Sequence, residues 1–143
     1  MMLTGVDGGP ARRFTTAGCL VLLASVAGCG SLAADSGSAV DAAKSFEQAL
    51  SNGDGLKACS RLTTKAVSAL AESEGKPCPR AILTIGLPQS AHQTSADAYG
   101  VNAVVRTGTD VLFLTNSTGQ WLVTAAGCRR QPDDQPYSCL VAG

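Results

Sequence analysis

The chain has 143 residues, with 11 basic side chains, 11 acidic side chains and one histidine, so its formal net charge is zero. That length fits one compact domain, and the balanced charge argues against the basic surface of a nucleic-acid-binding protein. Aromatic residues make up only 4% and charged residues 15% of the sequence, which leaves neither a stacking platform for bases nor a charged tail.

The first 28 residues are predicted to form a secretory signal peptide. Arg12 and Arg13 precede an uncharged stretch that runs from residue 14 to residue 28. This stretch is shorter than the roughly 20 apolar residues that span a bilayer. A basic flank, a short apolar segment and small residues at its end are typical of a cleaved leader. A buried core helix is the alternative, but the upstream residues offer nothing for it to pack against.

The end of this leader resembles a bacterial lipobox. Val26, Ala27, Gly28 and Cys29 supply an aliphatic residue, two small residues and then a cysteine. The resemblance implies that the thiol of Cys29 receives a diacylglyceryl group and that the leader is cut just before it. Cys19 also follows an Ala-Gly pair, but almost no apolar segment precedes it, so we exclude Cys19 as the lipid site.

Lipidation of Cys29 would hold the mature protein at the extracytoplasmic face of the cell membrane, because two or more acyl chains anchor a protein firmly. Residues 29–38 are small and polar, and we expect them to form a lipidated tether. Residues 39–143 are expected to form a single α+β domain that contains no second membrane-spanning segment.

The first half of this domain is predicted to be helical, because apolar residues recur at helical spacing between capping residues. Ser38 is the expected N-cap of the first helix, which Asn52 and Gly53 end. Four helices are expected: residues 38–51, residues 54–62 with Asp54 as the cap, a third that Thr63 or Thr64 caps and Gly75 ends, and residues 80–85.

The second half contains the β-branched residues and turn signals typical of strands. The expected strands are residues 101–106, 111–115, 120–126 and 137–141. Within the second strand, Val111 and Phe113 point to one face, and Leu112 and Leu114 point to the other. One face should pack on the helices. The other must be covered by curvature, by a tail or by another molecule, which makes it a candidate surface for a protein partner or a homodimer.

Four cysteines remain after the leader and the lipid site are set aside, and they are predicted to form two disulfides. An even number of cysteines outside the cell is typical of disulfide bonding. Three connectivities are possible, and we favour the pairs that are local in sequence, Cys59–Cys78 and Cys128–Cys139. A zinc site would need closer pairs such as C-x-x-C, so we expect no metal.

Helices followed by an antiparallel sheet resemble the NTF2-like (nuclear transport factor 2-like) fold, in which the helices pack into a curved sheet and form a cone. The order of elements from residue 40 to residue 141 carries this resemblance. The chain is also similar to small actinobacterial lipoproteins with paired cysteines, and the matching segments are residues 46–50, 58–59, 75–78, 110–114, Trp121 and 125–128. A plain two-layer α+β sandwich is the alternative fold.

An NTF2-like enzyme of the isomerase or dehydratase type would use His92 with Asp97 or Asp110. General acid–base catalysis needs such a group to be held near its proton with a tuned pKa. We instead expect His92 in a polar loop, Asp97 before a strand, and Asp110 solvated in a turn where it pairs with Arg106. No serine lies in a nucleophile elbow.

The sequence therefore predicts a non-catalytic cell-envelope lipoprotein that displays a small ligand-binding or protein-binding domain. The alternatives are the enzyme that uses His92, and a structural or regulatory subunit of an envelope complex. We expect no cofactor and no nucleic-acid partner.

Overall fold

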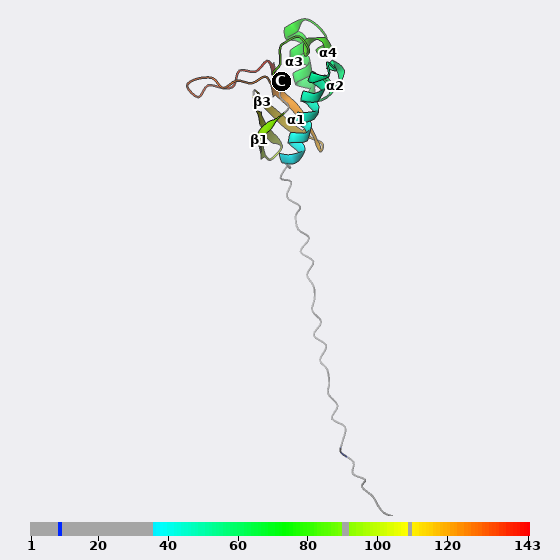
Figure 1. Cartoon of the computed structure of the whole chain (residues 1–143), viewed down its shortest axis with the longest axis vertical. Coiled ribbons are helices and arrows are strands. Elements are labelled where there is room, and N and C mark those ends of the chain that lie inside the picture. The colour runs from blue at the N-terminus through cyan, green and yellow to red at the C-terminus, as the bar shows by residue number, and fades with distance from the viewer. Residues whose placement is uncertain (1–8, 10–35, 90–91, 109) are drawn as a thin grey trace, which may run out of the picture. The chain divides into compact units, whose positions relative to one another are not determined.

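The computed structural model describes residues 9, 36–89, 92–108 and 110–143. The predicted leader, the proposed lipid site Cys29 and most of the expected tether lie outside these residues. The described domain has two layers, with four helices on one face of an antiparallel sheet (Figure 1).

Helix α1 (Ser36–Ser51) lies along the sheet and buries the face predicted from its apolar spacing. Its buried apolar side chains are those of Ala39, Ala43, Phe46, Ala49 and Leu50. The helix begins two residues earlier than expected, so the predicted N-cap Ser38 lies inside its first turn. Its end is as predicted, because Gly53 adopts a left-handed conformation with φ of 67°.

The next two helices have the caps that the sequence predicted. The side chain of Asp54 accepts a hydrogen bond from the Lys57 N–H and caps α2 (Gly55–Ser60). Thr63 caps α3 (Thr64–Glu74), which ends at Gly75 in the left-handed conformation. Both ends of α3 therefore follow from local chemistry, since a threonine oxygen satisfies an orphan N–H and glycine adopts positive φ without strain.

The fourth helix, α4 (Cys78–Ala81), lies earlier in the chain than the predicted span of residues 80–85. Pro77 is the N-cap of α4, and Pro79 lies in its first turn, where the N–H group that proline lacks would have no helical partner in any case. The hydroxyl of Thr84 donates to the carbonyl oxygens of Arg80 and Ala81. These carbonyl oxygens therefore bond to a side chain, and the helix does not continue to residue 85.

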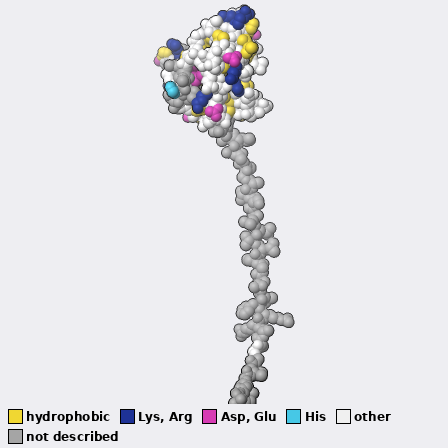
Figure 2. Space-filling view, turned by 45° about the vertical axis from the view of Figure 1, so that its right-hand side comes forward, with side chains coloured by type: hydrophobic (Ala, Val, Ile, Leu, Met, Phe, Trp, Pro, Cys, Tyr) yellow, Lys and Arg dark blue, Asp and Glu magenta, His cyan; other side chains and the backbone are white. Residues whose placement is uncertain are grey.

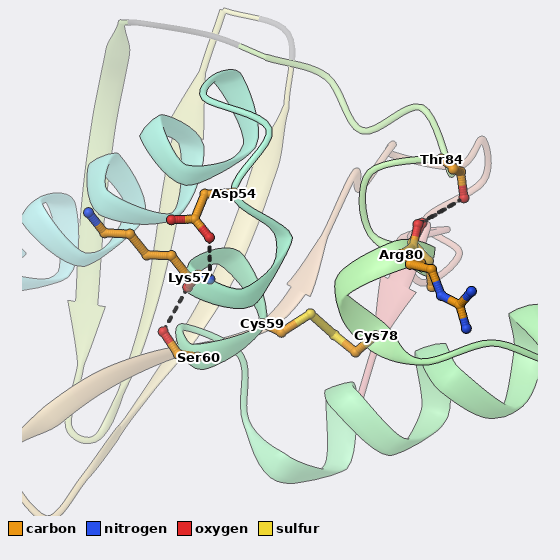
Figure 3. Close-up of a disulfide and its surroundings, with 8 residues drawn as sticks. Asp54, Lys57, Cys59, Ser60, Cys78, Arg80 and Thr84 are labelled. Atoms are coloured by element: carbon orange, nitrogen blue, oxygen red, sulfur yellow. Dashed lines mark hydrogen bonds between the residues drawn. A yellow bond between two sulfur atoms is a disulfide. The ribbon is translucent and has the colours of Figure 1, made fainter.

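A disulfide joins α2 to α4, as the sequence predicted. The Cys59–Cys78 bond holds the two short helices together (Figure 3), with a Cα–Cα separation of 6.2 Å. Neither α2 nor α4 is long enough to be stable alone, so their positions depend on this cross-link and on packing against α1 and α3.

The sheet has five strands in sequence order, each antiparallel to the next. They are β1 (Gln93–Tyr99), β2 (Asn102–Thr107), β3 (Val111–Ser117), β4 (Gln120–Ala126) and β5 (Val141–Ala142). The α+β class is confirmed, and the sheet has one strand more than expected. The NTF2-like cone is not confirmed.

Two strands differ from their predicted positions. β1 occupies a segment expected to be a polar loop, and it contains Asp97, which was expected to precede a strand. β1 is an edge strand in which Ala96 and Ala98 pack beside the core as partly buried side chains, and alanine gives little strand signal. β5 is only two residues long, and of the predicted strand at residues 137–141 it contains only Val141. Leu140 and Ser138 still hydrogen-bond to Gly127 and Arg129 beyond the end of β4.

Inward-facing residues of the sheet form the core together with the helices. The largest fully buried side chains are those of Phe46, Ile82, Val105, Leu112, Leu114, Val123 and Val141. Val111, Phe113 and Leu122 point to the other face and are only partly buried. The expected division of apolar residues between two faces is therefore confirmed.

We expect the Cys59–Cys78 disulfide to contribute about 3 kcal/mol to the free energy of unfolding, because it closes a loop of 19 residues in the unfolded chain. Replacing both residues, Cys59→Ala with Cys78→Ala, should lower the urea midpoint accordingly while the protein still folds. A loss below about 1 kcal/mol would show that packing alone holds α2 and α4 in place.

Candidate functional site

The most distinctive surface feature is an arm formed by residues 128–139. The Cys128–Cys139 disulfide closes its base, and this pairing confirms the second sequence-local pair. Just beyond the disulfide, the Arg129 N–H donates to the Ser138 carbonyl at 2.8 Å, and the Ser138 N–H donates back to the Arg129 carbonyl at 3.0 Å. Figure 1 shows the arm leaving the domain on the side of the sheet away from α1.

The tip of the arm has an unusual backbone conformation. Asp133 and Asp134 have positive φ values of 57° and 55°, a conformation that few residues other than glycine adopt. Pro132 and Pro136 flank them, and all four residues are exposed. Prolines and a closed base restrict the unbound loop, and such preorganisation lowers the entropy lost on binding a partner.

The arm covers part of the outward face of the sheet. The ring of Tyr137 contacts that of Phe113 edge to face, with 5.2 Å between centroids. The guanidinium of Arg130 lies 6.0 Å from the centroid of Tyr137, within the range of a cation–π interaction. The open apolar face is therefore covered in part by a disulfide-closed loop rather than by the curvature, tail or second molecule that the sequence suggested.

Beside the arm lies the outer sheet face, which we define as Asp97, Val104, Arg106, Val111, Phe113 and Leu122. All of these side chains are partly buried, and those on β2, β3 and β4 alternate with buried neighbours. Asp97 and Arg106 form an ion pair across β1 and β2. The expected pairing of Arg106 with Asp110 is therefore wrong, because Asp110 points into the protein.

Asp110 is buried, with 6% of its surface exposed, and the expectation that it is solvated is wrong. Its Oδ1 accepts hydrogen bonds from the N–H groups of Val111 and Cys128, at 2.6 and 2.8 Å. Its Oδ2 accepts from the Gly127 N–H at 3.0 Å. Burial raises the pKa of the Asp110 carboxyl above its usual value, although these backbone hydrogen bonds oppose the rise.

The Asp110 bonds fix the base of the arm. Antiparallel pairing of β3 with β4 brings the turn before β3 close to the end of β4. There Gly127 has positive φ, and a Cβ atom on it would lie 2.9 Å from Leu87 and Leu140. Asp110 is therefore a positioning residue for the arm. No motif in the sequence signals this role, since the contact joins residues 17 and 18 positions apart.

The residues of the enzyme alternative have separate positions and environments. His92 is exposed and immediately precedes β1. Asp97 is paired with Arg106 on the outer sheet face, and Asp110 is bound to backbone amides beneath the arm. Each carboxylate thus has a structural partner of its own.

One further buried carboxylate, that of Glu47, was missed by sequence reasoning. It has only 6% of its surface exposed and lies on the buried face of α1. The burial of Glu47 could have been predicted from helical spacing. Glu47 follows Ala43 by four residues and precedes Leu50 by three, so all three lie on one face of the helix.

A cavity of about 240 Å³ lies between the end of α1 and the segment after α4. Its lining residues are Leu50, Ser51, Gly53, Ile82, Leu83, Gly86, Leu87 and Gln89. None of these described lining residues is ionisable, and the volume is below the roughly 300–1,000 Å³ of typical small-molecule sites.

In the part of the chain that the structure describes, no three or more histidine, cysteine, aspartate or glutamate side chains are grouped to hold a metal ion. Of the described helices, none has the length and apolar character needed to cross a membrane. Comparison of the chain with protein-family models, curated protein sequences and solved structures finds no match.

We expect Asp110→Asn to destabilise the protein by about 1–3 kcal/mol, because the amide would direct an N–H group at a buried backbone N–H. Urea denaturation at neutral pH measures this change. The matched control is Asp97→Asn on the outer sheet face, whose partly exposed ion pair should contribute at most about 1 kcal/mol. Equal losses in the two variants would contradict the role of Asp110.

The same variant also tests the raised pKa of Asp110. A carboxyl whose pKa is higher in the folded state binds more protons there, so stability falls as pH rises from the usual value of 3.8 through the raised value. The stability difference between the native protein and Asp110→Asn should therefore narrow across this window. A difference that widens with rising pH would mean that the three hydrogen bonds outweigh burial.

Proposed function

We propose that this protein is a non-catalytic cell-envelope lipoprotein, anchored through Cys29, whose domain binds a protein partner outside the cell. The arm is the observation that carries the proposal. It combines a closed base, a restricted tip and an adjacent apolar sheet face, and this combination suits a protein surface better than a small molecule.

Two disulfides support an oxidising, extracytoplasmic location. Figure 2 shows acidic and basic side chains interspersed over much of the face drawn, which fits a soluble domain with zero net charge. Asp97 is held in an ion pair with Arg106, and Asp110 accepts hydrogen bonds from backbone N–H groups. These structural roles support a non-catalytic function for the domain.

The outer sheet face favours a second candidate, a structural or regulatory subunit of an envelope complex. Val104 and Phe113 are cross-strand neighbours and remain partly exposed. A permanent partner would cover them, whereas a transient partner could be held by the arm alone. Stoichiometric co-purification from detergent-solubilised membranes would favour the subunit.

The anchor is tested by Cys29→Ala, with Cys19→Ala as the matched control, in a bacterial host that processes lipoproteins. Alkynyl palmitate should label the native protein and the Cys19→Ala variant, whose membrane fractions should match. Cys29→Ala should lose the label and retain its leader, because no thiol remains for lipid transfer. Undiminished labelling of Cys29→Ala would contradict the anchor.

The arm is tested by a photo-crosslinking amino acid placed in intact cells at Gln135, next to the tip. We expect a discrete crosslinked product there and none at Ser68, an exposed position on α3 that serves as the control. The product should disappear when residues 132–136 are replaced by a glycine-serine segment of equal length. Crosslinking of equal strength at both positions would argue against the arm as the binding element.

A further inference from the structure

The last turn of α1 lies at the end of the domain where β4 finishes, so the first turn of α1 lies at the opposite end. Leu50, in the last turn of α1, shares a cavity with Leu87. The Leu87 side chain in turn lies close to Gly127, just after β4. A helix of 16 residues is about 24 Å long. The start of α1 therefore lies toward the opposite end of the sheet, as the label α1 and its colour allow the reader to follow in Figure 1.

At that opposite end the β1–β2 and β3–β4 turns lie next to each other. The Val101 carbonyl accepts hydrogen bonds from the Asn116 N–H and from the Thr115 hydroxyl. We call this end the tether end and define it as residues 36–40, 98–102 and 117–120.

The tether end presents an aromatic ring and an aliphatic side chain without any charge. Tyr99 is 64% exposed and Val101 is 60% exposed, on either side of the turn at Gly100. None of the residues that make up the tether end is aspartate, glutamate, lysine or arginine. Tyrosine has an apolar body and a polar tip, and it is enriched at the interface between bilayer and water.

The length of chain before α1 keeps this end close to the proposed anchor. Six residues, 30–35, separate Cys29 from Ser36, and a chain of that length spans at most about 25 Å when fully extended. A short tether of this kind gives an effective concentration on the order of millimolar. Even a weak contact between the tether end and the lipid surface would then form often.

We propose that the tether end rests on the bilayer surface, with Tyr99 and Val101 among the lipid headgroups. This inference rests on the proposed lipidation of Cys29 and adds a direct contact between the folded domain and the membrane. The contact is uncharged, so it does not require anionic lipid. Leu83 is also exposed but lines the cavity at the opposite end, where this geometry predicts no lipid contact.

The test places tryptophan at each end of the full-length acylated protein, in the variants Tyr99→Trp and Leu83→Trp. Each is purified from bacterial membranes and reconstituted into phosphatidylcholine vesicles with or without brominated acyl chains. Emission of the native protein, which contains Trp121, is subtracted. We expect a blue shift and a loss of emission in brominated vesicles for Tyr99→Trp, and neither change for Leu83→Trp. Val101→Trp repeats the test if Tyr99→Trp folds poorly.

The outcomes separate this inference from the proposed anchor. Acylated protein that stays on the vesicles but shows no quenching in Tyr99→Trp or Val101→Trp would overturn the contact and leave the anchor intact. Equal quenching at both ends would overturn the orientation. Quenching that requires added phosphatidylglycerol would overturn the uncharged contact. Intact mass showing no acyl group on the native protein would overturn both proposals.

Discussion

Three backbone N–H groups converge on the buried carboxylate of Asp110, and the position of the arm depends on them. A carboxylate inside a protein is tolerated when hydrogen bonds replace its lost water. Gly127 makes this arrangement geometrically feasible, because its positive φ and missing side chain let the chain turn beside Leu87. β4 ends at Ala126, just before Gly127, and the Cys128–Cys139 disulfide then closes the base of the arm.

Small side chains determine how the helical layer meets the sheet. Ala39 and Ala43 are completely buried on α1, and Ala96 and Ala98 pack beside the core from β1. Alanine lets a helix approach a sheet closely because little side chain stands between the two backbones. The larger apolar residue Phe113 lies on the outward face, where the arm supplies only part of the cover.

Much of the fold was predictable because its signals are local. Asp54 and Thr63 cap helices, Gly75 ends one, and the β3–β4 hairpin turns at Thr118 and Gly119, which both have positive φ. The sequence-local disulfides were also predictable from cysteine number and spacing. The features that were not predicted depend on contacts between residues that are distant along the chain.

Three of these errors share that cause. β1 is held by pairing with β2 and by packing beneath α1, so its own sequence carries little strand signal. Asp110 looks like an ordinary turn residue until the sheet register brings Gly127 and Cys128 to it. The last strand was predicted at residues 137–141, but of that span only Val141 lies in β5, and Ser138 instead bridges to Arg129 in the arm. The candidate site was therefore less predictable than the scaffold that supports it.

The arrangement of the two ends of the domain connects the arm with the proposed anchor. Gly127 and the base of the arm lie at the end of the sheet where α1 finishes, whereas Ser36 starts α1 at the other end. With the tether end resting on the bilayer as proposed, the length of α1 would separate the base of the arm from the lipid surface by about 24 Å. A partner that binds the arm would then approach from outside without displacing lipid, so the domain could contact the bilayer and a protein at the same time.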